Sequence, residues 1–303
     1  MNLIEAIGLG KKYGSTWALR ECSLSIPAGH VTALVGPNGA GKTTLLNLAV
    51  GLSTPSAGAL SVLDGKPPGS PASLDDIAFV AQDTPLYKNL SAADMLHLTR
   101  NLNRYLDRDY AETRLGELGI PLKRKAGRLS GGQQAQLALT LALARRPRLL
   151  VLDEPVAMLD PIARQDFMAT VMTAVADDDV SVLLSSHVLT ELERVADYLI
   201  LMSQGRVQVA GEVDDLLACH RVFTGPAAEV ATYAERPVVH VRSAGALAHL
   251  LVRATSDDPV PKGWEAHPVG MEELALAYLR EPDAASLPGP VSGRDTDRWE
   301  VTR

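Results

Sequence analysis

Runs of apolar residues that end in polar ones recur through the first two thirds of the chain. Three of them, Val31–Val35, Leu149–Leu152 and Val180–Leu184, are almost wholly apolar, which is typical of strands in a parallel sheet covered on both faces. The first run leads into a glycine-rich turn at residues 36–41 and then into Lys42–Val50, whose pattern is helical. This order of strand, turn and helix predicts an α/β fold.

Helical patterns occupy the segments between the runs. Ser91–Leu118 is polar and carries several arginines, with a capping serine at its start and Asp94 in the acidic capping position, and it predicts one helix. A further helix opens at Ser130, with Gln133 three residues later to complete a capping box. Its apolar repeat ends at Pro147, which does not continue a helix.

The character of the chain changes after about residue 211. Before this point, two short apolar runs within Tyr198–Ala210 flank residues 204–205, Gln-Gly, and predict a hairpin. Residues 212–284 then alternate short strand-like pieces, such as Val238–Val241, with helical ones, such as Met271–Leu279. We expect a small accessory α/β domain here.

Composition narrows the class of protein. The 303 residues carry a formal net charge of −7, which argues against nucleic acid as the main partner. Cys22 and Cys219 are too few for a disulfide framework or a cysteine metal site. The start of the chain lacks the basic and apolar segments of a signal peptide, and no run approaches the roughly 18 apolar residues of a membrane-spanning helix. We therefore expect a soluble cytosolic protein.

The glycine-rich turn has the composition of a phosphate-binding loop. Gly36-Pro-Asn-Gly-Ala-Gly-Lys-Thr43 matches the pattern G-x-x-x-x-G-K-[ST], in which glycines let the backbone wrap closely around phosphates and the following helix adds its positive end. Lys42 would reach the β- and γ-phosphates, and the Thr43 hydroxyl would ligate Mg²⁺. A glycine-rich turn that merely precedes a helix is the alternative, and the correct order of strand, loop and helix weighs against it. The expected nucleotide-binding residues of this loop are Gly36, Pro37, Asn38, Gly39, Ala40, Gly41, Lys42, Thr43 and Thr44.

Two acidic residues follow the buried run Leu149–Leu152. Asp153 lies where a carboxylate can hold magnesium through water, and Glu154 lies where a carboxylate can orient an attacking water and accept its proton. Two adjacent acids after a strand could equally be solvated loop residues. Combined with a phosphate-binding loop, they predict the hydrolysis of a nucleoside triphosphate.

A short motif then points to a family. Leu129-Ser-Gly-Gly-Gln133, which precedes Asp153-Glu-Pro155, resembles the signature sequence of ATP-binding cassette proteins, and other phosphate-loop ATPases lack it. The resemblance extends over roughly residues 3–215. It implies ATP hydrolysis on a mostly parallel α/β sheet, with antiparallel strands at the N terminus and an inserted helical subdomain.

The resemblance assigns roles to residues outside these motifs. Tyr13 resembles the aromatic residue that stacks on adenine, although a lone tyrosine before a glycine is also common in turns. Gln82 resembles the glutamine that contacts magnesium and the attacking water, and His187 resembles the histidine that bonds the γ-phosphate. The implied catalytic residues are Glu154, His187 and Gln82, and the implied metal ligands are Thr43, Gln82 and Asp153.

The signature itself would form a second phosphate-binding site. Ser130 caps a helix that starts with two glycines, so backbone N–H groups and a positive helix end face outward. The family implies a head-to-tail dimer, either a homodimer or a heterodimer, with each ATP between one subunit's phosphate-binding loop and its partner's signature. Because no residue of the catalytic set is replaced, both sites of a homodimer would be active. The residues that would act on the partner's nucleotide are Ser130, Gly131, Gly132, Gln133 and Asp160, the last as the loop aspartate that communicates across the dimer.

Other polar residues have simpler explanations. Family members commonly carry arginine where this chain has Gln136, and the change would weaken a local ion pair. Arg100, Arg104 and Arg108 repeat at helical spacing, and a solvated helix face is favoured over an anion site. Residues 177–179, three aspartates, are expected in a loop. The remaining histidines lack the spacing of metal ligands, and we expect them at the surface or hydrogen-bonded in the core. They are His30, His97, His220, His240, His249 and His267.

The resemblance favours a subunit that drives a separate membrane permease from the cytoplasmic face of the cell membrane. Leu86, Tyr87 and Leu90 resemble the groove that receives a coupling helix, although they also fit an ordinary core. Met271–Arg280 is similar to the closing helix of exporter ATPases of the antibiotic-resistance and bacitracin type, which favours export of a drug, a peptide or a lipid-like compound. A cassette ATPase that acts on ribosomes or DNA is the alternative. The single signature and the lack of heptad repeats or a basic arm weigh against it.

The expected organisation is a nucleotide-binding domain over residues 1–215, with its helical subdomain at about 86–146, and an accessory domain over residues 216–284. Residues 285–303 are rich in Ser, Gly, Pro and charge, and we expect a disordered tail. The expected ligands are ATP and Mg²⁺, and no nucleic acid is expected.

Overall fold

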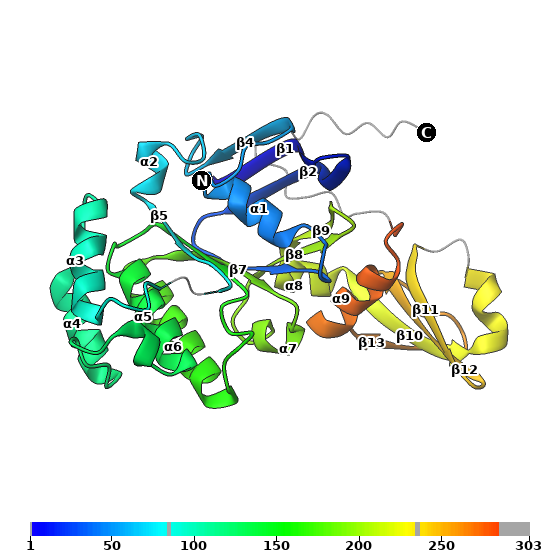
Figure 1. Ribbon diagram of the computed structural model, residues 1–303. Coiled ribbons are helices and arrows are strands. Elements are labelled where there is room, and N and C mark those ends of the chain that lie inside the picture. Colours follow the sequence, from blue (N-terminus) through cyan, green and yellow to red (C-terminus); the bar gives the residue numbers. More distant parts are fainter. Residues whose placement is uncertain (1, 84–85, 234–236, 285–303) are drawn as a thin grey trace.

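A six-stranded central sheet organises the molecule (Figure 1). The computed structural model describes residues 2–83, 86–233 and 237–284. In these residues the expected α/β architecture is confirmed, with a mostly parallel central sheet, an antiparallel sheet from the N-terminal strands and a second antiparallel sheet near the C terminus. The expected disordered tail lies outside the described residues.

The central sheet brings the ends of its strands to one edge. Its order is β5-β6-β7-β3-β8-β9, and every neighbouring pair is parallel except the β8–β9 hairpin, which was predicted. The carboxyl ends of β3, β6 and β7 therefore meet at the same edge, where ligands of such sheets bind. The strands are β3 (Val31–Val35), β5 (Ile77–Val80), β6 (Leu149–Asp153), β7 (Ser181–Ser186), β8 (Tyr198–Ser203) and β9 (Arg206–Glu212).

Each face of the central sheet is covered by its own hydrophobic cluster. On β3, Leu34 faces the cluster formed with α1 and the N-terminal sheet, whereas Ala33 faces the cluster formed with α5, α6, α7 and α9. This explains why the strands are apolar on both sides. The first layer contains β1 (Asn2–Tyr13), β2 (Thr16–Pro27), β4 (Ala57–Val62) and α1 (Lys42–Ala49), and α2 (Pro71–Leu74) precedes β5. The second contains α5 (Gly131–Leu143), α6 (Pro161–Asp178), α7 (Leu189–Leu192) and α9 (Met271–Arg280).

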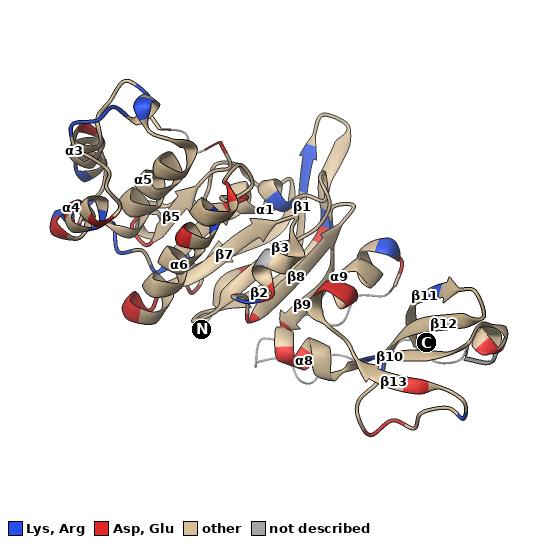
Figure 2. Cartoon of the chain, turned by 90° about the horizontal axis from the view of Figure 1, so that it is seen from below, with Lys and Arg blue, Asp and Glu red and all other residues tan. Residues whose placement is uncertain are grey.

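A helical block at one end of the molecule (Figure 2), which contains α3 and α4, has two helices where the sequence predicted a single long one. Two helices, α3 (Ala92–Leu102) and α4 (Arg108–Glu117), replace the single helix expected over residues 91–118. Asn103 is extended, and the Asp107 side chain accepts a hydrogen bond from the Tyr110 N–H and so begins a new helix. The predicted Ser91–Asp94 capping box is present at the start of α3. A short 3-10 helix, η1 (Ala126–Arg128), leads into α5.

Two smaller expectations about charged residues are corrected in part or in full. Arg100, Arg104 and Arg108 are exposed, as expected, but they do not share a helix face, because the helix ends before Arg104 and Arg108 starts the next one. The three aspartates at residues 177–179 are not a loop. The first two complete α6, and the third ends it in a left-handed conformation. An ion pair of 2.5 Å between Asp178 and Arg146 holds this helix end.

The C-terminal sheet lies at the opposite end of the molecule from the helical block (Figure 2). One of its faces contributes to the same hydrophobic cluster as the central sheet. Its order is β11-β12-β10-β13. Phe223 and Trp264 belong to a small cluster on one face, whereas Val222 and Leu251 on the other face join α9 and the core beneath the central sheet. The elements of this part are α8 (Val213–Ala218), β10 (His220–Pro226), η2 (Ala227–Tyr233), β11 (Val238–Ala244), β12 (Leu247–Arg253) and β13 (Glu265–Pro268). Within the described residues, no helix is long and apolar enough to cross a membrane.

Candidate functional site

The phosphate-binding loop joins β3 to α1. Two of its positions require glycine, one because neighbouring backbone lies too close for a side chain and one because of its backbone conformation. A Cβ on Gly36 would lie 2.3 Å from the Met202 carbonyl oxygen, so no larger residue fits. Gly41, the N-cap of α1, has a φ of 102°, which L side chains rarely adopt. No side chain caps α1, and its first turn contains no acidic residue. The start of this helix therefore offers N–H groups and a positive end to an anion.

Lys42 is a buried cation directed into this loop. Its side chain is only 5% exposed, and its ammonium group donates to the Gly36 carbonyl oxygen at 2.7 Å. The same nitrogen lies 3.4 Å from a carboxylate oxygen of Glu154. The loop and the acid after β6 thus meet, as the sequence predicted from two motifs more than a hundred residues apart.

A serine that was not predicted as a site residue fixes both acidic residues. The Ser185 hydroxyl, at the end of β7, donates to Asp153 Oδ1 at 2.6 Å and accepts from the Glu154 backbone N–H at 2.9 Å. Asp153 is buried, whereas its neighbour Glu154 turns into the site with a φ of 45°. The signal in the sequence is the appearance of serines at the end of an otherwise apolar strand.

His187 completes a group of three polar side chains. Its Nδ1 lies 3.1 Å from Glu154 Oε2, so the Glu154 carboxylate contacts Lys42 through one oxygen and His187 through the other. Glu154 is only 10% exposed, whereas His187 is 46% exposed. A carboxylate held between two cationic or proton-donating groups, at the edge of the sheet beside an uncapped helix end, can orient a water molecule and accept its proton.

The remaining residues expected on the same subunit, Gln82, Thr43 and Tyr13, are all exposed. Gln82 follows β5 and is exposed. The register that pairs Val80 with Leu152 places Gln82 at the same sheet edge as Glu154. Thr43, in the first turn of α1, is exposed. Tyr13 ends β1 and is 52% exposed, with the Lys11 ammonium 5.0 Å from its ring centroid. Of the residues expected to form the coupling groove, Leu86 and Leu90 are partly buried against the helices, whereas Tyr87 is 66% exposed, and the adjoining residues 84–85 lie outside the described residues.

The signature forms the N terminus of α5, and the predicted capping box is present. Ser130 Oγ accepts from the Gln133 N–H at 3.2 Å, and Gln133 Oε1 accepts from the Ser130 N–H at 3.2 Å. The two glycines between them differ in purpose. A Cβ on Gly132 would lie 2.9 Å from Ala163 of α6, whereas a Cβ on Gly131 would meet open space. Gly132 thus allows two helices to pack, and Gly131 leaves the helix end open.

The structure also explains two residues near the signature. Asp160 is the N-cap of α6, and its Oδ1 accepts from two backbone N–H groups at 3.0 Å. Gln136 is buried, and its Oε1 accepts from the Thr170 hydroxyl at 3.4 Å. Arg114 of α4 donates to the same hydroxyl. An arginine from another helix thus lies close to the position where family members carry one.

The other histidines behave as expected of structural residues. His220 is buried, and its ring nitrogens bond the Leu216 carbonyl oxygen at 2.7 Å and the Tyr278 hydroxyl at 2.8 Å. Burial lowers the pKa of His220, which keeps the ring neutral. His240 lies 3.0 Å from Glu281. Across the described residues, no group of three or more His, Cys, Asp or Glu side chains could hold a metal ion.

Comparison with known proteins agrees with this geometry. A sequence model of the family described as ABC transporter matches residues 19–157. The lantibiotic transport ATP-binding protein SrtF of Streptococcus pyogenes is 31% identical over 214 residues, which cover 70% of this chain and 92% of that protein. The chain belongs to the ATP-binding cassette (ABC) transporter family. It is therefore an ATP-binding and ATP-hydrolysing subunit of an ABC transporter.

Two further relatives show the breadth of the family around this ABC ATPase. The thiamine import ATP-binding protein ThiQ of Escherichia coli is 34% identical, over 65% of this chain and 87% of that protein. A solved structure of cbiO1 from Clostridium perfringens, described as part of the ABC transporter complex cbiONQ, has a TM-score of 0.61 and 28% identity. It covers 72% of this chain and 91% of its own. The alignments thus account for about 200 residues and leave close to a third of the chain outside the shared cassette.

Proposed function

We propose that this ABC ATPase hydrolyses ATP with Glu154 as the general base, at a site completed by the signature of a second cassette. The observation that carries the proposal is the position of the Glu154 carboxylate between Lys42 and His187, at the sheet edge beside the uncapped N terminus of α1. A carboxylate that is only 10% exposed and fixed at this point accepts a proton from water that attacks a bound γ-phosphate.

Each group has a separate task in this scheme. Backbone N–H groups of the loop and the Lys42 ammonium neutralise the β- and γ-phosphates. In the structure Lys42 bonds the Gly36 carbonyl oxygen and lies near Glu154, so it would leave these partners for the phosphates when ATP binds. His187 would donate to a γ-phosphate oxygen, Gln82 would contact the attacking water, and Tyr13 would stack on adenine.

The residues present fit a Mg²⁺ ion. One oxygen of the buried Asp153 carboxylate is bonded by Ser185, and the other can hold a metal-bound water. The hydroxyl of Thr43 is exposed beside the loop, and Gln82 supplies an amide oxygen. These are hard oxygen ligands, which Mg²⁺ prefers together with water and phosphate oxygens. When bound, the ion would neutralise charge on the phosphates during hydrolysis.

The dimer part of the proposal rests on the open end of α5. Gly131 faces open space, and α5 packs on α3 and α4 and on one face of the central sheet, whereas α1 covers the other face. A γ-phosphate held by the loop of a second subunit would accept hydrogen bonds from this helix end. Ser130, Gly131, Gly132, Gln133 and Asp160 are the residues that would act there.

We further propose that the ATPase drives a separate membrane permease from the cytoplasmic side and that transport is outward. The lantibiotic relative supports a peptide-like or otherwise amphipathic cargo, and the closing helix α9 supports the exporter class. The thiamine relative is named as an importer, so direction needs its own experiment. The permease would meet the surface that follows Gln82, where Tyr87 is 66% exposed.

The Glu154→Gln variant tests the ATPase proposal. It keeps the size of the side chain and one acceptor oxygen but removes the base, so ATP binding should persist while turnover falls by about a hundredfold or more. The ATP-bound variant should elute as a dimer in gel filtration, and with ADP it should elute as a monomer. Asp64→Asn, at an exposed carboxylate paired with Arg148 on the surface, is the control and should turn over at the parent rate. Turnover by Glu154→Gln at the parent rate would contradict the assignment.

The transport proposal needs a separate measurement. Affinity capture of the chain from native membranes should identify a co-purifying permease, and that permease in detergent should stimulate the ATPase. Inverted membrane vesicles that contain both proteins should accumulate labelled cargo in an ATP-dependent way if transport is outward. Stimulation only by ribosomes or DNA would contradict transport.

A further inference from the structure

The segment that follows His187 has little stability of its own. His187 is joined through Val188 to α7, a helix of only four residues, and isolated helices this short do not persist in water. On its other side the histidine follows β7, which the sheet fixes. Ser186 Oγ accepts from the Val188 N–H at 2.9 Å and so tightens the turn. Since His187 itself is half exposed, its place depends on how firmly both flanking segments are held.

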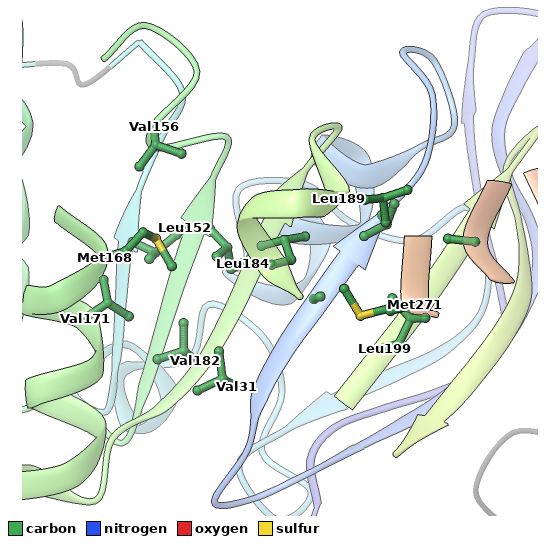
Figure 3. Packing of buried hydrophobic residues seen from close by; sticks show 14 of the residues in the cluster. Val31, Leu152, Val156, Met168, Val171, Val182, Leu184, Leu189, Leu199 and Met271 are labelled. Carbon is green, nitrogen blue, oxygen red and sulfur yellow. The ribbon is translucent and has the colours of Figure 1, made fainter. Parts of the chain in front are cut away.

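The packing that holds α7 comes partly from the C-terminal end of the described chain. Leu189 and Leu192 of α7 are buried in the cluster beneath the central sheet, and this cluster also contains Met271 and Leu274 of α9. Helix α9 lies against both α7 and β8. Figure 3 shows Met271 beside Leu199 of β8, with Leu189 on the neighbouring segment.

The start of α9 also lies close to the end of α7. A Cβ on Gly270, the N-cap of α9, would be 3.7 Å from Oε1 of Glu193, the residue that ends α7. Met271, the first residue of α9, is 1% exposed. Met271 thus anchors the start of α9 in the core, whereas Gly270 and Glu193 approach each other at the surface.

We propose that Met271 is a positioning residue for ATP hydrolysis: through α7 it holds His187 against Glu154. The inference rests on the proposed role of His187. The accessory residues 216–284 would then influence catalysis in the cassette, because a displacement of the first turn of α9 would move the segment that follows His187. A misplacement of about 1 Å at a reacting group costs up to a hundredfold in rate.

Met271→Ala tests the proposal by a split in the kinetic constants. The cavity should loosen α7, so kcat should fall about five- to tenfold, whereas KM for ATP should change less than twofold because the phosphate-binding loop is untouched. Met271→Leu fills a similar volume and should restore kcat. Leu276→Ala, on the exposed side of the same helix, is the matched control and should keep the parent kcat.

A double-mutant cycle with His187→Ala tests whether the effect runs through the histidine. If Met271 acts by holding His187, Met271→Ala should lower kcat in the parent and have no further effect once His187 is removed. An equal loss in both backgrounds would overturn the inference. A parent-like kcat of Met271→Ala would also overturn it. If His187→Ala alone retains the parent rate, the proposed role of His187 fails instead, and the two failures are thus distinct.

A second pair of variants tests the same contact without a substitution in the hydrophobic core. Gly270→Glu would place a carboxylate near Glu193, whereas Gly270→Gln has the same size without the charge. At low ionic strength the Glu variant should show about a twofold lower kcat than the Gln variant, and high salt should abolish the difference by screening. Equal kcat values for this pair at low salt, in folded protein, would count against the contact between α9 and α7 as the route. This pair also decides the matter if thermal melting shows that Met271→Ala is unfolded.

Discussion

Two helix N termini in this molecule lie where phosphate is proposed to bind, and they differ in their caps and in their charge. Helix α1 follows its N-cap Gly41, has no side-chain cap, and begins with a buried lysine. Helix α5 follows its N-cap Ser130, whose side chain and that of Gln133 already satisfy two backbone N–H groups. One end is uncapped and cationic, whereas the other is capped, exposed and without a basic residue in its first turn.

This difference suits two kinds of binding. An uncapped helix end with a buried cation has strong unmet hydrogen-bonding capacity, so it can bind a nucleotide within a single subunit. A capped and neutral end is stable without a ligand and adds only a few hydrogen bonds when a phosphate approaches. The first site is therefore expected to govern affinity for ATP, and the second to govern closure of the dimer.

The largest expected effect comes from the uncapped end. Lys42→Ala removes charge-assisted hydrogen bonds to phosphate worth about 1.5–3 kcal/mol, so affinity for ATP should fall roughly ten- to hundredfold. Isothermal calorimetry on the purified chain measures this directly. Lys66→Ala removes a partly exposed ion pair with Asp76, away from the phosphate-binding loop, and is the control. Unchanged ATP affinity in Lys42→Ala would contradict the claim that the N terminus of α1 governs affinity.

Ser130→Ala should affect turnover and leave the affinity of a single subunit intact. Loss of the cap costs about 1 kcal/mol of helix stability, and the open end of α5 loses its fixed geometry. We expect ATP affinity within twofold of the parent and an ATPase rate lowered about tenfold, a factor that corresponds to one lost hydrogen bond to phosphate. A Ser91→Ala variant removes the equivalent capping box of α3 and should lose similar stability without the loss of rate.

The two signature glycines should respond in opposite ways. Gly132→Ala brings a methyl group to 2.9 Å from Ala163 and should destabilise the fold by about 1–3 kcal/mol. Gly131→Ala meets open space and should leave stability equal or raise it by up to about 1 kcal/mol, since alanine favours helix. Its Cβ would nevertheless stand where a partner's phosphate approaches, so ATPase activity should fall. Thermal melts and turnover assays on both variants check this, and equal melting temperatures would refute the division of tasks.

The smallest effect is expected on the inner side of α5. Gln136 Nε2 is buried without a hydrogen-bond partner in the described structure, and its oxygen makes only a 3.4 Å bond. Gln136→Leu should therefore change stability by less than about 1 kcal/mol, in either direction, and leave turnover unchanged. Chemical denaturation measures it. A large loss of activity would extend the phosphate-related role of α5 beyond its first turn.

Local motifs made much of the site predictable from the sequence. Ser130 and Gln133 form the expected capping box, because the partners are three residues apart and need no tertiary structure. The Asp153–Glu154 pair and the phosphate-binding loop were expected to act on one nucleotide, and the parallel strands that carry them do end at one sheet edge. The contact of Lys42 with Glu154 bears out that placement.

Features that depend on the packing of distant segments were not predictable in the same way. The break between α3 and α4 depends on the Asp107 cap, which competes with an otherwise continuous helical pattern. The bridge by Ser185 requires knowing that β7 lies beside β6. The apolar pattern of the C-terminal part predicted a small domain but did not reveal that α9 packs on the central core.

The backbone at Glu154 has a consequence for engineering. Its φ of 45° lies in the left-handed region, where a residue other than glycine or asparagine costs about 1–2 kcal/mol. The chain keeps a carboxylate there despite this backbone strain. A screen that selects only for heat resistance would therefore favour glycine or asparagine and lose the base. Libraries meant to make this ATPase more robust should hold position 154 fixed and search elsewhere.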